Sequence, residues 1–171
     1  QIPLPPPSIP GLEMNELLRQ ACADQRIRMF LNAKAVGADV VDGRVTAVHA
    51  QVAGAVKRIK ADVVVYAGGG IESGALLLDS YGKLSETVFG LPVTAGEELV
   101  HGDYWGTPQP LFAAGLAVDE DMRPLDGKGQ PVYLNLHAIG GLLAGAQRTH
   151  EKSGEGIALG SAATAVAAIT R

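Results

Sequence analysis

The sequence predicts an α/β fold in which strands that end at glycine turns alternate with helices. Two apolar runs support this prediction, at residues 63–67 and 133–139, because each of them stops at consecutive glycines. A third observation is the abundance of glycine, 22 of 171 residues, beside few aromatic side chains. Tight turns between strands and helices use glycine because it adopts positive φ angles without steric cost. The length is sufficient for one domain with a sizeable core.

The composition argues against several classes of function. The 14 basic and 18 acidic residues give a net charge of −4, without the basic stripe that contacts nucleic-acid phosphates, so we expect no nucleic-acid partner. The single cysteine, Cys22, can form no internal disulfide and supplies no metal cluster. We therefore predict no metal site and a reducing, cytoplasmic location. No uninterrupted apolar run reaches the ~18 residues that a transmembrane helix needs.

The beginning of the chain predicts a connector followed by an amphipathic helix. Residues 1–11 are rich in proline, which favours an extended connector that follows another part of the protein. Apolar side chains then recur at helical spacing from Met14 to Cys22, so we predict a helix over residues 12–25. A short apolar run predicts a strand at residues 27–31.

The next segment predicts a small antiparallel meander. Strands at residues 36–41 and 45–52 flank an Asp-Gly pair, the dipeptide that favours a type I′ turn and hence a hairpin. A third strand at residues 56–60 completes the meander. Alternation in the second strand places His49 on a solvated face.

The apolar run at residues 63–67 has no alternation, which is typical of a strand buried on both faces in a parallel sheet. It ends at three consecutive glycines, Gly68, Gly69 and Gly70. Open α/β sheets bind their ligands at the carboxyl ends of their strands, so this turn is a candidate binding site. A tight exit turn without a ligand is the alternative.

The middle of the chain predicts a helix over residues 71–81 and then an inserted irregular segment over residues 82–131. Glycine and proline interrupt this insertion, which is longer than most structural loops and is a candidate substrate or partner surface. The cluster from His101 to Trp105 combines an imidazole, a carboxylate and two aromatic rings, and we expect a structural or interface role for it. We also expect a short helix at residues 110–116 and a solvated acidic turn at residues 119–121.

The last segment, residues 132–171, predicts a strand, a glycine turn, a loop and a helix. The strand stops at Gly140 and Gly141, and Gly154, Glu155 and Gly156 open an alanine-rich helix. Small residues on every face of this helix predict a central position against a sheet. Glycines admit a ligand close to the backbone, while a helix N-terminus offers free N–H groups and a partial positive charge. Together they predict a seat for an anionic or electron-rich group.

Four further polar residues near this seat are candidates for a functional role. Arg148, His150 and Lys152 lie close together in the sequence and are candidates for recognising a small phosphorylated substrate. Simple hydration of a surface loop is the alternative for these three residues. His137 lies near the end of the last strand, where we expect a packed or hydrogen-bonded core histidine.

Two glycine-terminated strands would bring two turns to the same edge of a sheet, and the crevice between them suits a planar cofactor with an anionic arm. Residues 62–70 and 136–158 resemble the corresponding segments of Rossmann-type FAD/NAD(P)-binding flavoproteins. Short motifs at residues 6–11, 89–93, 118–126 and 151–156 resemble, more narrowly, the family of anaerobic glycerol-3-phosphate dehydrogenase B subunits. The chain resembles only the later part of that family, and the G-x-G-x-x-G fingerprint is absent.

This resemblance implies an incomplete Rossmann-type flavoprotein fold that binds FAD or FMN. The implied flavin contacts are the glycines of the two turns and of the last helix, together with Glu155, which we expect to point outward because its charge would oppose electron density on a reduced flavin. Gly141 stands where many relatives have an acidic residue. A scaffold subunit that has lost the cofactor is therefore an alternative.

The same resemblance implies a subunit of an enzyme that oxidises glycerol 3-phosphate to dihydroxyacetone phosphate. Electrons would pass through an iron–sulfur subunit towards quinone, which allows peripheral association with the inner face of the cell membrane through partners. No convincing general base is visible, and we expect this chain alone to be inactive. Another alternative is a flavin-dependent reductase of the fumarate-reductase type.

Overall fold

The structure is a computed structural model that describes residues 8–103 and 106–171. The chain divides into two compact units, residues 1–33 and 34–171, which are described separately here. Among the described residues, no helix is both long enough and apolar enough to cross a bilayer.

The first unit contains helix α1 (Ile9–Asp24), which confirms the predicted helix but begins three residues earlier. Ser8 caps its N-terminus by accepting a hydrogen bond from the Gly11 N–H, at 3.1 Å, and a proline in the first turn favours the same start. Residues 8–11 are therefore not part of a connector, while residues 1–7 of the predicted connector lie outside the described residues.

The strand predicted at residues 27–31 is wrong. Residues 27–30 have no regular secondary structure, and a turn follows them. Arg26 and Asn32, on either side, have positive φ angles of 56° and 54°, which a strand does not accommodate. Apolar composition alone therefore misidentified this segment.

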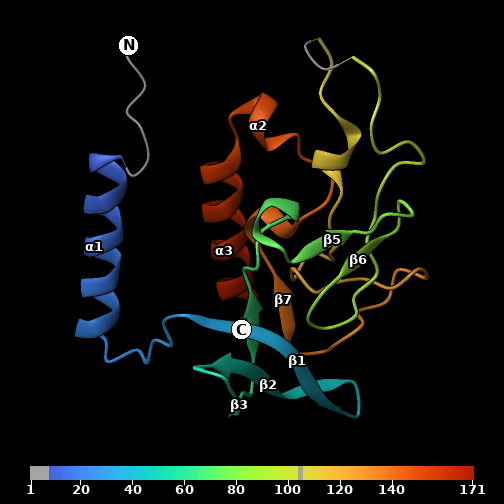
Figure 1. The fold of residues 1–171 in the computed structure, drawn as a ribbon. Coiled ribbons are helices and arrows are strands. Elements are labelled where there is room, and N and C mark those ends of the chain that lie inside the picture. Colours follow the sequence, from blue (N-terminus) through green and yellow to red (C-terminus); the bar gives the residue numbers. More distant parts are fainter. Residues whose placement is uncertain (1–7, 104–105) are drawn as a thin grey trace. The chain divides into compact units, whose positions relative to one another are not determined.

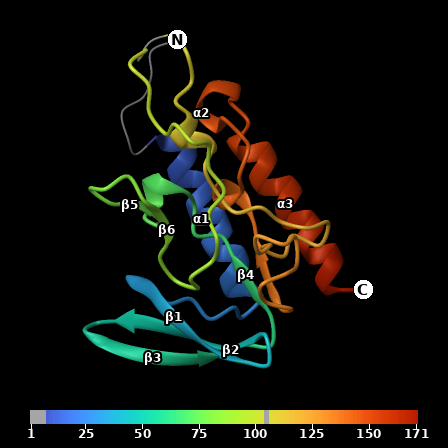
Figure 2. The same cartoon turned by 90° about the vertical axis from the view of Figure 1, so that its right-hand side faces the viewer.

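The predicted meander is confirmed as strands β1 (Ala33–Val41), β2 (Arg44–Val52) and β3 (Ala55–Lys60), which form a sheet in that order (Figure 2). Asp42 and Gly43 both have positive φ angles, 50° and 70°, as a type I′ turn requires. Val45 and Ala47 of β2 are buried and attach the meander to the core.

A charged row crosses the meander and corrects the expected solvated position of His49. The Oδ1 atom of Asp39 lies 2.8 Å from Nε2 of His49, and Nε of Arg58 donates a hydrogen bond to Asp39 Oδ2. The hydrogen bond from Arg58 holds the pKa of Asp39 below its ordinary value of 3.8. His49 is half-buried and paired, because the carboxylate of the neighbouring strand lies within hydrogen-bonding distance of its ring.

Strands β4 (Val64–Tyr66) and β7 (Leu136–Ala138) form a parallel pair, with Val64 opposite Leu136 and Tyr66 opposite Ala138 (Figures 1 and 2). The prediction that these two strands end at the same edge of a sheet is thus confirmed. Burial of β4 on both faces is not observed, because Val65 remains 46% exposed. Among the described residues this parallel sheet has two strands, and nothing covers the outer face at Val65.

The helix predicted at residues 71–81 is wrong. A single 3-10 turn, η1 (Ile71–Ser73), ends at Gly74, whose φ angle of 78° interrupts the helical backbone. The chain then forms an antiparallel hairpin of β5 (Leu76–Leu78) and β6 (Leu84–Glu86). Three consecutive leucines fit a strand as well as a helix, and pairing with β6 decides between the two.

The remainder of the predicted insertion is largely irregular, as expected. The helix predicted at residues 110–116 is reduced to a 3-10 turn, η2 (Pro110–Ala113), because Gly115 pairs with Thr94 in an isolated β-bridge. The acidic segment at residues 119–121 forms a turn, but Asp119 is half-buried, since its carboxylate binds the Arg123 side chain at 2.8 Å.

The chain ends with η3 (Gly140–Leu142), α2 (Arg148–Glu151) and α3 (Gly154–Ile169). Helix α3 lies alongside the β4–β7 pair and packs on η3 through its buried residues Ser161 and Ala165 (Figure 1). The prediction of a central helix is wrong for this chain, because Leu159 and Val166 are 74% and 56% exposed. Small residues allow close packing on any face, but one face alone is covered here.

The core lies between the meander, the β4–β7 pair and the β5–β6 hairpin; its largest members are Val45, Tyr66, Leu76, Phe89, Leu91, Leu116, Leu136 and Leu142. Asn135, 3% exposed, connects these parts. Its Oδ1 accepts from the Val45 N–H at 2.8 Å, and its Nδ2 donates to the carbonyls of Val45 and Asp62, each also at 2.8 Å. One side chain therefore ties β2 to the segment that enters β4.

We predict that Asn135→Ala in the full-length protein lowers the free energy of unfolding by about 3 kcal/mol, because it removes three hydrogen bonds and strands buried backbone groups. Urea denaturation measures this change. Gln51→Ala, at an exposed position of β2, is the matched control and should change stability by less than about 0.5 kcal/mol. Equal stabilities of the two variants would contradict the connecting role of Asn135.

Candidate functional site

The parallel pairing of β4 and β7 brings the two glycine turns together. A Cβ atom added at Gly70 would lie 3.0 Å from the carbonyl oxygen of Gly141, so the two backbones approach each other closely enough to crowd a side chain. Gly69 and Gly140 have φ angles of 73° and 68°, a conformation that favours glycine. We call residues 68–70 and 140–141 the glycine cradle.

Tyr66 and Glu86 support the cradle from the core side. A Cβ atom at Gly68 would lie 2.5 Å from the Tyr66 ring, so the ring fills the space beneath this bend. The Tyr66 hydroxyl donates to Glu86 Oε1 at 2.8 Å, and the edge of the ring meets Phe89 with centroids 4.9 Å apart. Burial, together with the hydrogen bond to Glu86, raises the pKa of the Tyr66 phenol above its ordinary value.

Glu86 is itself a buried carboxylate with a complete set of donors. Beside the Tyr66 hydroxyl, it accepts hydrogen bonds from the backbone N–H groups of Val88, Phe89 and Leu91, at 2.7, 2.8 and 3.1 Å. Four donors offset the cost of removing this charge from water. Glu86 therefore fixes the loop after β6 and, through Tyr66, the position of Gly68.

Arg148 is the cation that the structure places at the cradle. A Cβ atom at Gly141 would lie 2.6 Å from its NH1 atom, and one at Gly70 would lie 2.9 Å from its NH2 atom. The same NH2 atom lies 3.3 Å from Glu72 Oε2, so an ion pair joins α2 to η1 across both bends. The alternative of simple hydration does not describe this residue, because its side chain is 23% exposed.

The cradle offers backbone donors to a ligand. Within the part of the chain that the structure describes, the N–H groups of Gly69, Gly70 and Gly141 donate to no protein acceptor. The N–H of Gly140 differs, because it donates to Ser161 Oγ at 2.9 Å. Three backbone N–H groups beside a guanidinium suit an electron-rich ligand.

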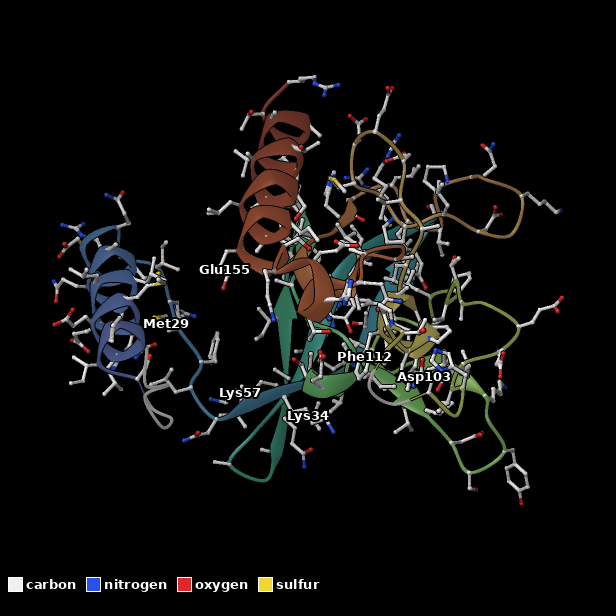
Figure 3. The ribbon with its side chains drawn as sticks, turned by 90° about the horizontal axis from the view of Figure 1, so that it is seen from above. Met29, Lys34, Lys57, Asp103, Phe112 and Glu155 are labelled. Carbon is white, nitrogen blue, oxygen red and sulfur yellow. The ribbon has the colours of Figure 1, made fainter. Side chains whose placement is uncertain are left out.

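The N-terminus of α3 is a second group of donors, at some distance from the first. No side chain caps it, so its first N–H groups, at Gly154, Glu155 and Gly156, have no intrahelical partner. Ser161, which contacts Gly140, lies seven residues further along α3, or about 10 Å at the rise of an α-helix. Glu155 is exposed on the outer side of α3, in agreement with its expected orientation (Figure 3).

His150 and Lys152 are separated from Arg148 and line a surface hollow of about 350 Å³. The other lining residues come from the loop before η2, from η2 itself and from the segment around α2: Gly106, Thr107, Pro108, Gln109, Phe112, Gln147 and Thr149. We call this feature the 106–152 hollow. The three residues grouped by sequence therefore belong to two places, since Arg148 lies at the cradle and His150 and Lys152 line the hollow.

The remaining candidate side chains form hydrogen bonds within the protein, which indicates structural roles. His137 is buried, and its Nδ1 lies 2.7 Å from the carbonyl oxygen of Asp121, which confirms a hydrogen-bonded core histidine. The His101 backbone N–H donates a hydrogen bond to Gln109 Oε1, and the Asp103 carboxylate accepts hydrogen bonds from the Gly106 N–H and the Thr107 hydroxyl. Tyr104 and Trp105 of that cluster lie outside the described residues. Among the described residues, no group of three or more acidic, histidine or cysteine side chains is arranged to hold a metal ion.

Sequence reasoning missed Glu86, Asn135 and Gln147. Asn135 had a detectable signal, because it is a polar residue inside an apolar strand, where a buried amide must find hydrogen-bond partners. Glu86 and Gln147 had none, since each acts through residues distant in the sequence or through a loop conformation.

Comparison with known proteins places these features in a family. The family described as "FAD binding domain" matches residues 1–157. The B subunit of the anaerobic glycerol-3-phosphate dehydrogenase of Yersinia pestis bv. Antiqua (strain Antiqua) is 28% identical over 166 residues, covering 94% of this chain and 38% of the relative. The corresponding protein of Halobacterium salinarum (strain ATCC 29341 / DSM 671 / R1), named as a probable B subunit, is 31% identical over 163 residues, covering 93% and 38%.

The B subunit of the same enzyme from Pasteurella multocida (strain Pm70) is 27% identical over 172 residues, covering 96% of this chain and 39% of the relative. The chain thus spans about two fifths of the length of the curated relatives that it matches. No solved structure matches it significantly.

The support beneath the cradle can be tested with Glu86→Gln in the full-length protein. An amide would place an N–H₂ group among N–H donors, so we expect the free energy of unfolding to fall by about 2 kcal/mol or more. Glu120→Gln, at an exposed position, is the control and should be neutral within about 0.5 kcal/mol. Chemical denaturation gives both values, and a neutral Glu86→Gln would refute the assigned role.

Proposed function

Because this chain belongs to the FAD-binding domain family, we propose that its glycine cradle holds the flavin of an oxidoreductase subunit with a Rossmann-type fold. The observation that carries the proposal is the approach of the two bends, where a Cβ at Gly70 would lie 3.0 Å from the Gly141 carbonyl. Ligands of open α/β sheets bind at the carboxyl ends of strands, and both bends follow such ends.

The residues present fit one part of a flavin nucleotide. The cradle has three N–H groups that donate to no protein acceptor among the described residues. The Arg148 guanidinium and the Ser73 hydroxyl lie against its glycines, because a Cβ atom at Gly141 would meet Arg148 at 2.6 Å and one at Gly69 would lie closer still to Ser73. The G-x-G-x-x-G turn that holds a pyrophosphate at a helix N-terminus is not in this sequence. The chain would therefore contribute the cradle for the ring system, and the pyrophosphate would depend on residues outside it.

A bound flavin supplies the redox chemistry, and the protein supplies binding, orientation and electrostatics. The N–H groups of Gly69, Gly70 and Gly141 would orient the electron-rich edge of the ring. Arg148, held by Glu72, adds a fixed positive charge beside them. The N-terminus of α3, from Gly154 to Gly156, adds the positive end of a helix dipole, with Glu155 directed outward.

We propose that the reaction served is oxidation of glycerol 3-phosphate to dihydroxyacetone phosphate. The relatives named as B subunits of anaerobic glycerol-3-phosphate dehydrogenase support this substrate. By the same resemblance, the chain would act in a complex that passes electrons through an iron–sulfur subunit towards quinone, in the cytoplasm or at the inner face of the membrane. FAD is favoured over FMN, since the family is described by FAD.

A scaffold subunit without cofactor is the second candidate. Two observations favour it: the absent dinucleotide fingerprint, and Gly141 at the place where flavoproteins often have an acidic residue. In such a protein the cradle would be a close backbone contact stabilised by Arg148 and Glu72, with no ligand.

We predict that the full-length protein carries a flavin and that Gly70→Ala loses it. The added methyl group would lie 2.9 Å from the Arg148 guanidinium and 3.0 Å from the Gly141 carbonyl, so Arg148 must move and the two bends must separate by a few tenths of an ångström. Visible absorption of the purified protein measures flavin content, and the variant should retain less than about a tenth of it.

Gly127→Ala is the matched control, because a Cβ there meets nothing within 4 Å. It should keep its flavin, and circular dichroism should show that both variants are folded. A full-length protein that takes up neither FAD nor FMN would contradict the proposal and favour the scaffold. A folded Gly70→Ala with undiminished flavin would contradict the location at the cradle.

A further inference from the structure

Building on the proposed function, we propose that the 106–152 hollow is the site that holds the substrate as a small polyol phosphate. Lys152 and His150 would bind the phosphate, and Gln147 would accept a hydrogen bond from a hydroxyl group of the polyol. The proposal separates substrate recognition from Arg148, which faces the glycine cradle.

The charge of the hollow favours an anion. Two of its nine lining residues are basic and none is acidic. The nearby carboxylate of Glu151 is occupied, because it accepts hydrogen bonds from the Gln147 N–H at 3.0 Å and the Ser153 hydroxyl at 2.9 Å. Asp103 is likewise bonded to the Gly106 N–H and the Thr107 hydroxyl, at 3.0 and 3.1 Å. These hydrogen bonds come from neutral donors and leave the charge of each carboxylate in place, so the fixed positive charge at the hollow is that of Lys152.

Gln147 indicates what else the ligand must offer. Its Nε2 donates to the Gln109 carbonyl at 3.2 Å, but its Oε1 is buried and has no hydrogen-bond donor among the described residues. A buried acceptor without a donor costs about 1–3 kcal/mol, so such an atom in a hollow is explained by a donor that arrives with a ligand. A hydroxyl group is such a donor, and a phosphate at neutral pH mainly accepts.

The opposite wall of the hollow is formed before any ligand binds. Gln109 accepts from the His101 N–H at 2.9 Å and donates to the carbonyls of His101 and Asp103, at 3.2 and 3.1 Å. Phe112 lines the same wall, where its ring provides an apolar surface for a short carbon chain; Figure 3 shows it in one segment with Asp103. A preformed wall lowers the entropic cost of binding.

The hollow also has a suitable position relative to the cradle. Gln147 lines the hollow, and its neighbour Arg148 contacts Gly141 of the cradle. The hollow and the cradle are thus linked in the chain by the adjacent residues Gln147 and Arg148.

The test uses the purified full-length protein and three probes: glycerol 3-phosphate, inorganic phosphate and glycerol. Calorimetry measures the affinity for each probe. Lys152→Gln should weaken binding of glycerol 3-phosphate and of inorganic phosphate by about tenfold, the loss expected for one charge-assisted hydrogen bond. Gln147→Met should weaken the binding of glycerol 3-phosphate by about fivefold and leave the affinity for inorganic phosphate unchanged.

Lys128→Gln, at an exposed lysine in the loop before β7, is the matched control and should leave all affinities unchanged. Equal affinities of Lys152→Gln and Lys128→Gln for both phosphates would overturn the proposal. The proposal would also be overturned if Gln147→Met lowered the affinity for inorganic phosphate as much as the affinity for glycerol 3-phosphate. Flavin content is measured separately by absorption. A flavin-free protein that binds the three probes as expected would refute the proposed flavin site and still support the proposed substrate site at the hollow.

Discussion

The buried amide of Asn135 is the interaction on which the arrangement of the second unit depends. Its side chain forms hydrogen bonds with the backbone of Val45 in β2 and of Asp62 before β4. Its backbone carbonyl accepts the N–H of Val64 at 2.9 Å. The meander and the parallel pair share no continuous sheet, so this amide replaces the ladder that would otherwise join them. Because β4 and β7 start from this fixed point, their far ends are also fixed, and the glycine cradle lies there.

The cradle itself combines two different kinds of support. Below Gly68, the Tyr66 ring and the Glu86 carboxylate form a buried, fully bonded pair. Beside Gly70 and Gly141, the partly exposed ion pair of Arg148 with Glu72 closes the gap between α2 and η1. A buried pair of this kind is costly to break, whereas a partly solvated ion pair contributes little to stability and is free to respond to a ligand.

Sequence reasoning located the meander, the two glycine bends and their adjacency, because turn chemistry and strand ends are local signals. It failed where contacts between residues distant in the sequence determine the secondary structure or the exposure of a residue. The leucines at residues 76–78 form a strand because β6 is available, and Val65 is exposed because the sheet has two strands among the described residues. Arg148 and Lys152 are four residues apart but belong to different sites, since α2 begins at Arg148 and ends before Lys152, whose φ angle of 58° stops the helix.

Ser161 connects helix α3 to the backbone of Gly140. Its hydroxyl donates to the carbonyl of Ile157 within α3, at 2.6 Å, and accepts the N–H of Gly140. The Ser161 hydroxyl thereby links the helix to the bend at Gly140, although α3 leaves most of its surface in solvent. The backbone of Gly140, just beyond the end of β7, therefore keeps its hydrogen-bond acceptor only while α3 stays in place.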